Sequence, residues 1–238
     1  SRPTGGARRR GRPRPPVSRS PTRAFGHARI VDIASGRTDA GVHAIGQVAS
    51  FRVQSTLPEY KLFAGINSVL PPDIALKDLQ EMPDGFNALK DAKNKVYIYR
   101  IKNQRLRPVL GRQYYWFVRY RLNLEKMRKA ASLLAGEHDF SAFCATGCEV
   151  QSRVRKLAPI EILELPDNML EITVESGGFL RHMVRNIVGT LVDVGRGKIK
   201  PEDIPEIAPD DVIGNALKSA IKENISKPAG KTPRSKKQ

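Results

Sequence analysis

The chain has few cysteines and histidines and no long apolar run. It has only two cysteines, Cys144 and Cys148, and the three residues between them exceed the two that separate the ligands of a zinc knuckle. There is no second cysteine pair, and the four histidines lack metal-ligand spacing. We therefore expect free thiols in a reducing compartment and no bound metal. No run of about eighteen apolar residues is present, so we also expect no membrane-spanning helix.

Acidic residues are missing from the start of the chain and scarce at its end. Residues 1–23 contain eight arginines and no acid, a charge of +8, and residues 218–238 contribute +6. Since the whole chain has a net charge of +17, only +3 remains for residues 24–217. The basic character therefore lies mostly at the two ends, and the total charge alone does not indicate a basic groove for a polyanion.

The composition of the two ends sets the predicted domain boundaries. Residues 1–29 are rich in Arg, Pro and Ser and lack the apolar stretch of a secretory signal, which predicts a disordered basic leader. Residues 226–238 predict a second basic tail. Between them we expect an N-terminal half at residues 30–95 and a C-terminal half at residues 96–225.

Hydrophobic periodicity predicts a mixture of strands and helices. Alternation of apolar residues, together with turn signals, favours strands at residues 47–53, 74–79, 95–103, 158–165 and 169–176. Helical spacing favours helices at residues 62–70, ended by two prolines, at 124–134, begun by an Asn123 cap, and at 180–194, ended by Gly195. Because the strands come in hairpin-like pairs, this order predicts an α+β fold rather than a doubly wound sheet.

A charged triplet flanked by glycines stands out in the segment SGRTDAGVHAIGQVASF. Arg37, Thr38 and Asp39 lie between Gly36 and Gly41. Glycine tolerates backbone conformations that other residues resist, so this pattern predicts a tight loop that displays its side chains. Aspartate is also a common turn residue, so the loop by itself does not define a site.

Two arginines and two tyrosines are further candidates. Arg181 and Arg185 fall together at the edge of the apolar stripe of the predicted 180–194 helix, one turn apart, where their guanidinium groups could lean into a cleft. Tyr97 and Tyr99 share one face of a predicted strand. Surface charge and sheet packing are the ordinary roles of such residues, so none of them defines a site alone.

The segment GRTDAGVHAIGQV resembles the signature of the bacterial-type tRNA pseudouridine synthase A family. Three further blocks are similar to that family and follow in the same order: PPDIALKDLQEMPDGFNALKDAKNKVYIYRI, AGEHDFSAFCATG and FLRHMVRNIVGTLVDVGRGKI. The resemblance covers roughly residues 33–225. Several long blocks in the right order are far more specific than a lone Gly-rich loop.

The resemblance implies an enzyme that isomerises uridine to pseudouridine in the anticodon stem-loop of tRNA, with no cofactor and no metal. It implies that Asp39 is the catalytic aspartate, that Tyr97 is the active-site tyrosine and that Arg185 pairs with the catalytic carboxylate. It also implies that Arg37 helps to evict the target base from the RNA helix. The other residues in these blocks that we expect to bind substrate are Thr38, Gly41, His43, Arg181 and His182.

The resemblance further implies the pseudouridine synthase fold, with two related α/β halves whose antiparallel sheets flank a central cleft, and a homodimer that binds tRNA. Family members begin with a strand and helix that carry Tyr-Asp-Gly and Gly-Trp-Gln and end with one more strand; we expect both parts to be absent here. Leu89 stands where the family has an arginine. We expect a soluble protein of an organelle (chloroplast or mitochondrion) or of the cytoplasm. The alternative is a non-catalytic basic RNA-binding protein or an inactive truncated remnant of such an enzyme.

Overall fold

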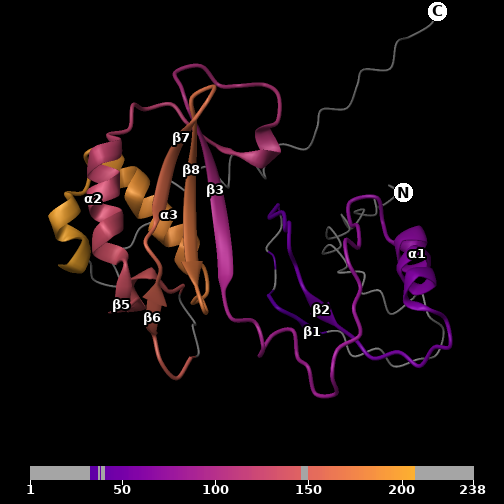
Figure 1. Cartoon of the computed structure of the whole chain (residues 1–238). Helices are drawn as coiled ribbons and strands as arrows, with labels where there is room; N and C mark the ends of the chain where they lie inside the picture. Colours follow the sequence, from indigo (N-terminus) through magenta and orange to yellow (C-terminus); the bar gives the residue numbers. More distant parts are fainter. Residues whose placement is uncertain (1–32, 37, 39–40, 146–149, 207–238) are drawn as a thin grey trace, which may run out of the picture. The chain divides into compact units, whose positions relative to one another are not determined.

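The computed structural model describes residues 33–36, 38, 41–145 and 150–206, and the chain divides into two compact units, Ser1–Asp91 and Ala92–Gln238. We describe each unit by itself (Figure 1). The predicted leader and basic tail lie outside the described residues. In the part of the chain that is described, no helix combines the length and the apolar character needed to cross a membrane.

The first unit contains a short hairpin and one helix. Strands β1 (Ile33–Ala34) and β2 (Ala49–Ser50) pair in antiparallel fashion, so only two residues of the predicted 47–53 strand are paired. The predicted helix is confirmed as α1 (Glu59–Val69), which begins directly after Pro58 and ends before a pair of prolines. Ile66 is the only buried residue of α1, so this helix contributes little to a core.

The predicted strand at residues 74–79 is wrong, because a side chain takes the place of a partner strand. The Asn67 amide group donates to the Leu76 carbonyl at 3.1 Å and accepts from the Leu76 amide at 2.8 Å. This pair of bonds satisfies the backbone of Leu76 as a neighbouring strand would. The segment therefore forms these backbone hydrogen bonds without joining a sheet, although its apolar residues alternate as in a strand.

The second unit is built on a six-stranded mixed sheet within its described residues. Its strands are β3 (Lys95–Asn103), β4 (Trp116–Val118), β5 (Gly136–Asp139), β6 (Val154–Leu157), β7 (Glu161–Leu165) and β8 (Met169–Ser176). The order is β4-β3-β8-β6-β5, and β7 also pairs with β8. Among these strands only β4 runs parallel to its neighbour, β3, so the sheet is mixed, whereas the family resemblance implies antiparallel sheets.

The long β3 and β8 strands form the centre of this sheet. They pair in antiparallel fashion over eight residues, from Lys95 opposite Ser176 to Lys102 opposite Met169. The predicted hairpin of β7 and β8 is confirmed, and its turn places Asp167 and Asn168 at positive φ angles of 61° and 53°. Asp and Asn adopt this left-handed conformation more readily than other non-glycine residues, which explains the turn.

Two helices, α2 (Leu124–Leu134) and α3 (Met183–Gly195), pack with one face of the sheet in a common core (Figure 1). The prediction for α2 is confirmed in both bounds and in its cap, since the Asn123 side chain accepts from the Lys126 amide at 3.0 Å. Alternate residues of β8 are buried, and α3 is buried on all sides from Ile187 to Gly195. Short 3-10 helices complete the unit at η2 (Arg112–Tyr114), η3 (Ser141–Phe143) and η4 (Pro201–Glu206).

The glycine that terminates α3 is not the one that the sequence predicted. Gly195 is the last helical residue, and Gly197 takes the left-handed conformation at a φ of 75°. The Gly197 amide donates to the Val194 carbonyl and the Lys198 amide donates to the Asp193 carbonyl, both at 2.9 Å, which is the Schellman pattern. Gly195 is required for another reason: a Cβ there would lie 2.6 Å from the Met127 sulfur.

Candidate functional site

Tyr97 lies near the start of β3, opposite Val174 of β8. Its ring is half-buried and packs against the core, on the same face as Tyr99, which confirms that the two tyrosines share a face. Phe179, in the segment after β8, contacts the Tyr97 ring edge to face, with centroids 5.1 Å apart and planes at 89°. This geometry is favourable for aromatic pairs and fixes the orientation of the Tyr97 ring.

The helix that carries Arg185 begins later than predicted. Its first residue is Met183, and the preceding His182 has a left-handed backbone with a φ of 60°. Arg181 therefore lies in a turn before α3, and the prediction that Arg181 and Arg185 occupy successive turns of one helix is wrong. The reversal at His182 separates them, because a left-handed residue cannot continue an α-helix. Arg181 is exposed, and Arg185 is half-buried in the first turn.

A short segment after β5 holds the start of α3 in place. The Asn186 side-chain amide donates to the Phe143 carbonyl at 2.9 Å, and the Ala145 amide donates to the Arg181 carbonyl at 3.0 Å. Sequence reasoning missed Asn186 as well as Phe179. The signal for Asn186 was an amide side chain next to an arginine at the start of an apolar helix, which is too common to stand out.

Asp139 caps this supporting segment. Its carboxylate accepts from the Ser141 amide at 2.8 Å and from the Ser141 hydroxyl at 2.5 Å. The hydroxyl bond, followed by the amide bond, lowers the pKa of Asp139 below its usual value. A carboxylate with a lowered pKa stabilises the folded protein above its unfolded-state pKa, and that contribution is lost as the pH falls through the folded-state value.

Replacing Asp139 by asparagine should therefore destabilise the protein slightly, in a pH-dependent way. Because the side chain is exposed, we expect a loss of less than about 1 kcal/mol at pH 7. The difference from wild type should shrink below about pH 4, where the unfolded carboxyl is protonated. Urea unfolding at both pH values measures it, and a difference that is equal at the two would contradict this account.

The Gly-flanked loop is described only in part. Thr38, Gly41 and His43 are exposed, and Gly41 has a φ of 81°, which confirms that the loop uses glycine for a left-handed conformation. The Gln47 side chain ties the loop's two sides together, because it accepts from the Ser35 hydroxyl at 3.1 Å and donates to the Gly36 carbonyl. Arg37 and Asp39 lie outside the described residues.

The cysteines and acids offer no metal centre among the described residues. No group of three or more His, Cys, Asp or Glu side chains there could hold a metal ion. Cys144 is disulfide-bonded, so the prediction of free thiols is wrong for this residue. Cys148 lies outside the described residues.

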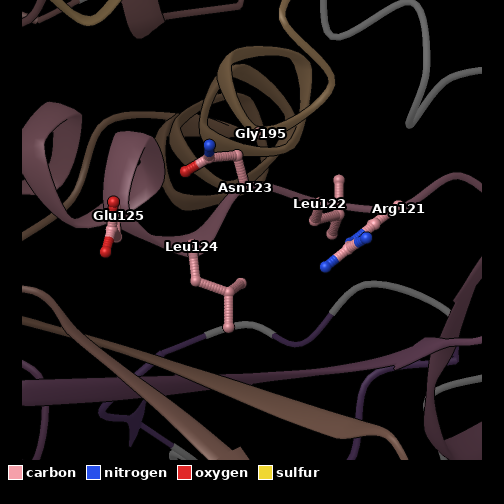
Figure 2. Close-up of a pocket in the computed structure, with 6 residues that line it drawn as sticks. All are labelled: Arg121, Leu122, Asn123, Leu124, Glu125 and Gly195. Atoms are coloured by element: carbon pink, nitrogen blue, oxygen red, sulfur yellow. The ribbon is translucent and has the colours of Figure 1, made fainter.

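Two pockets in the second unit are lined by residues that the sequence did not single out as candidate site residues. One, of about 410 Å³, lies where α2 begins and α3 ends (Figure 2). The other, of about 440 Å³, lies beside Lys102 and the loop that follows β3. Tyr97, Arg181 and Arg185 line neither of them.

Comparison with known proteins places these features in a family. Residues 130–223 match the family model described as tRNA pseudouridine synthase. The tRNA pseudouridine synthase A of Geotalea daltonii is 46% identical over 172 residues, which cover 72% of this chain and 70% of that protein. The protein of the same name from Caldicellulosiruptor saccharolyticus is 43% identical, over 74% of this chain and 71% of its own length. That of Myxococcus xanthus is 41% identical, over 76% and 68%.

These similarities combine high sequence identity with coverage of most of each chain. The aligned part exceeds two thirds of this chain and of each of the three relatives. It is also longer than the 130–223 match to the family model. The chain therefore belongs to the tRNA pseudouridine synthase A family.

Proposed function

We propose that this chain is a tRNA pseudouridine synthase that isomerises uridine to pseudouridine in the anticodon stem-loop of tRNA. The observation that carries the proposal is the 46% identity to a tRNA pseudouridine synthase A over 72% of the chain. The fold belongs to the proposal as well: two related α/β halves that flank a cleft, as the family resemblance implies. The described mixed α+β architecture of the second unit is compatible with it.

The proposed reaction rearranges one nucleoside without oxidation or reduction. The glycosidic bond between N1 and C1′ breaks, the uracil turns, and a bond forms between C5 and C1′. C5 loses its hydrogen as a proton, and N1 gains a proton, so atoms and electrons balance without a cofactor. A carboxylate can begin this sequence as a nucleophile at the sugar or at the uracil ring, or by removing a sugar proton. We assign that role to Asp39.

The other residues are proposed to hold and move the target nucleotide. Tyr97 would offer a flat ring for the flipped uracil and a phenol to take the C5 proton, and its support by Phe179 favours this role. Arg185 would keep the Asp39 carboxylate charged, and Arg37 would fill the space that the uridine leaves. Five residues are proposed as further substrate contacts: Thr38, Gly41, His43, Arg181 and His182.

Release of tritium from tRNA labelled at C5 of uridine tests the proposal directly. Formation of the C5 glycosidic bond expels that hydrogen, so the wild-type chain should release tritium with multiple turnovers. Binding that falls steeply with salt and shows no preference for tRNA, without any tritium release, would favour a non-catalytic polyanion-binding protein. A salt titration of tRNA and of a random RNA provides that comparison.

We also propose that the chain forms a homodimer through the sheet face opposite the helices. Val96, Ile98, Leu163 and Leu165 are exposed at 54%, 46%, 48% and 37%, and by alternation along the strands they share this face. Exposed aliphatic side chains gathered on one face are typical of a protein-binding surface.

Charge on and beside this face suits a second copy of the same chain. Glu171 and Glu175 of β8 lie opposite Arg100 and Val96 of β3 on this face. Arg100 forms an ion pair with Glu171 at 3.0 Å, which leaves Glu175 as the acid with no cation opposite it on β3. The loop after β3 carries Arg105 and Arg107, beside exposed Leu106. In a two-fold symmetric interface, the apolar side chains of this face would meet Leu106 of the partner's loop, and Glu175 would meet the arginines of that loop.

Replacing Ile98 by lysine should convert the dimer to monomer. The added cation would be buried in the interface and would repel the partner's arginine loop, which we expect to weaken association at least about tenfold. Sedimentation velocity at several concentrations measures the change. Leu133→Lys is the matched control, because Leu133 is exposed on α2, away from the sheet face. Equal sedimentation of wild type and Ile98→Lys would refute this interface.

A further inference from the structure

Two arginines lie over the ring of one tyrosine in the second unit, and a third arginine follows that tyrosine in the chain. Arg119, Tyr120 and Arg121 connect β4 to α2, and Arg196 directly follows α3. The Arg196 Cζ lies 4.2 Å from the centroid of the Tyr120 ring, and the Arg119 Cζ lies 5.6 Å from it. We call these four residues the arginine–tyrosine cluster. We infer that the cluster binds the phosphate backbone of tRNA, at the opposite end of α3 from Arg185.

The backbone that carries this cluster is held from both sides. The Asn103 side-chain amide donates to the Val118 carbonyl at 2.9 Å and to the Tyr120 carbonyl at 2.7 Å. The Asn123 amide donates to the Gly195 carbonyl at 2.8 Å, which joins the start of α2 to the end of α3. Leu122 is buried between these anchors. The arginines are therefore displayed on an ordered segment, which lowers the entropy lost on binding.

The cluster carries more positive charge than the nearby acids neutralise. Arg119 and Arg121 are exposed, and neither has an ion pair among the described residues. Asp193 is shared, since its carboxylate lies 3.4 Å from Arg196 and 3.5 Å from Lys198. Like charges held together in the free protein are unfavourable, and an anionic partner would relieve that repulsion.

An exposed acid that lines the same pocket does not cancel this charge. Glu125 lines the same pocket as Arg121, but Figure 2 shows its carboxylate and the Arg121 guanidinium at opposite ends of that pocket. Glu125 therefore does not pair with Arg121.

The chemistry of the cluster favours phosphate over a nucleobase. Guanidinium groups bind phosphate oxygens with two parallel hydrogen bonds, and stacking on a tyrosine ring holds such a group in a fixed plane. The Tyr120 ring is already in contact with two guanidinium groups, which leaves it poorly placed to stack on a base. An acidic protein segment would offer carboxylates to the same arginines. Binding to tRNA and binding to polyglutamate distinguish these two ligands.

The position of the cluster makes it a docking contact and not part of the reaction. Arg185 lies in the first turn of α3 and Arg196 lies just beyond the last, so about 15 Å of helix separates them. A contact at this distance would hold tRNA without touching the target nucleotide. The inference rests on the proposed function for the identity of the RNA, but it concerns residues with no role in the isomerisation.

The double variant Arg119→Gln/Arg121→Gln tests the inference in the full chain. Loss of two phosphate contacts should lower the slope of log K for tRNA against log salt by about 1.4 to 1.8. At a fixed low salt concentration we expect KM in the tritium-release assay to rise about tenfold while kcat stays unchanged. Arg196 is left in place, because its loss would leave the buried Asp193 short of a partner.

The control is the double variant Arg128→Gln/Lys129→Gln. It removes the same charge from α2, but these cations already pair with Glu164 and Glu202. The control should keep the wild-type salt slope, and equal changes in both variants would overturn the inference. So would a cluster variant that binds tRNA as wild type does but loses binding to polyglutamate, because that result assigns the cluster to an acidic protein. If wild type releases no tritium, the proposed function fails while the salt slopes still decide this inference.

Discussion

Replacing Asp39 by asparagine is expected to reduce tritium release from C5-labelled tRNA by at least about 10³-fold. Asparagine has nearly the same shape as aspartate, but its amide is neither a nucleophile nor a base. If the carboxylate begins the reaction in any of the three possible ways, the variant loses that step completely. Binding of tRNA should remain within about twofold of wild type, because phosphate contacts made elsewhere supply most of the affinity.

Two measurements make the Asp39→Asn result interpretable. Tritium release and tRNA binding are measured on the same preparation, so that loss of folding is distinguished from loss of chemistry. Asp84→Asn serves as the control, because Asp84 is an exposed turn aspartate in the first unit. Near-wild-type release by Asp39→Asn would show that the catalytic assignment is wrong. Equal loss in both variants would point to a general effect of removing negative charge.

Replacing Ile172 by alanine is expected to lower the free energy of unfolding by about 2 to 5 kcal/mol. Ile172 is fully buried in β8, where it lies opposite Tyr99 of β3 and Ile162 of β7. The substitution removes three carbons from the centre of the sheet, and strands on both sides prevent the gap from closing. Urea unfolding measures the change from the midpoint and the slope.

Ile98→Ala is the matched control for this prediction. Ile98 lies on the neighbouring strand β3 opposite Thr173, one position along from Ile172, but its side chain faces away from the helices and is 46% exposed. We expect it to cost less than about 1 kcal/mol at concentrations where the chain is monomeric. Similar losses at the two positions would mean that the outer face of the sheet is as well packed as the inner one.

Local sequence signals were sufficient where one residue type decides the conformation. The α2 helix was predicted to the residue, because the Asn123 cap and the apolar stripe both act within one or two turns. The alternation in β3 predicted that Tyr97 and Tyr99 share one face, because side chains of a strand alternate whatever its neighbours are. That this face is the inward one came from the structure. The left-handed Gly41 likewise follows from the absence of a Cβ.

Local sequence signals failed where a residue from another part of the chain forms hydrogen bonds with the backbone of the segment. The alternating segment at 74–79 is not a strand, because Asn67 satisfies Leu76 from another part of the chain. The helix of Arg185 begins at Met183, because the turn at His182 joins Arg181 to Ala145 and not to the helix. No pattern within the helix itself reveals that contact.

The sequence by itself determined the family and the proposed catalytic residues, because the chemistry needs Asp39, Tyr97 and Arg185 inside motifs that are contiguous in the chain. It also determined the elements whose periodicity is local. Only the tertiary structure decided the strand order, the parallel pairing of β4, the support of Tyr97 by Phe179 and the meeting of Tyr120 with Arg196. These features depend on contacts between residues far apart in sequence. Local sequence patterns do not reveal which distant surfaces become neighbours, because the packing of the whole core decides that.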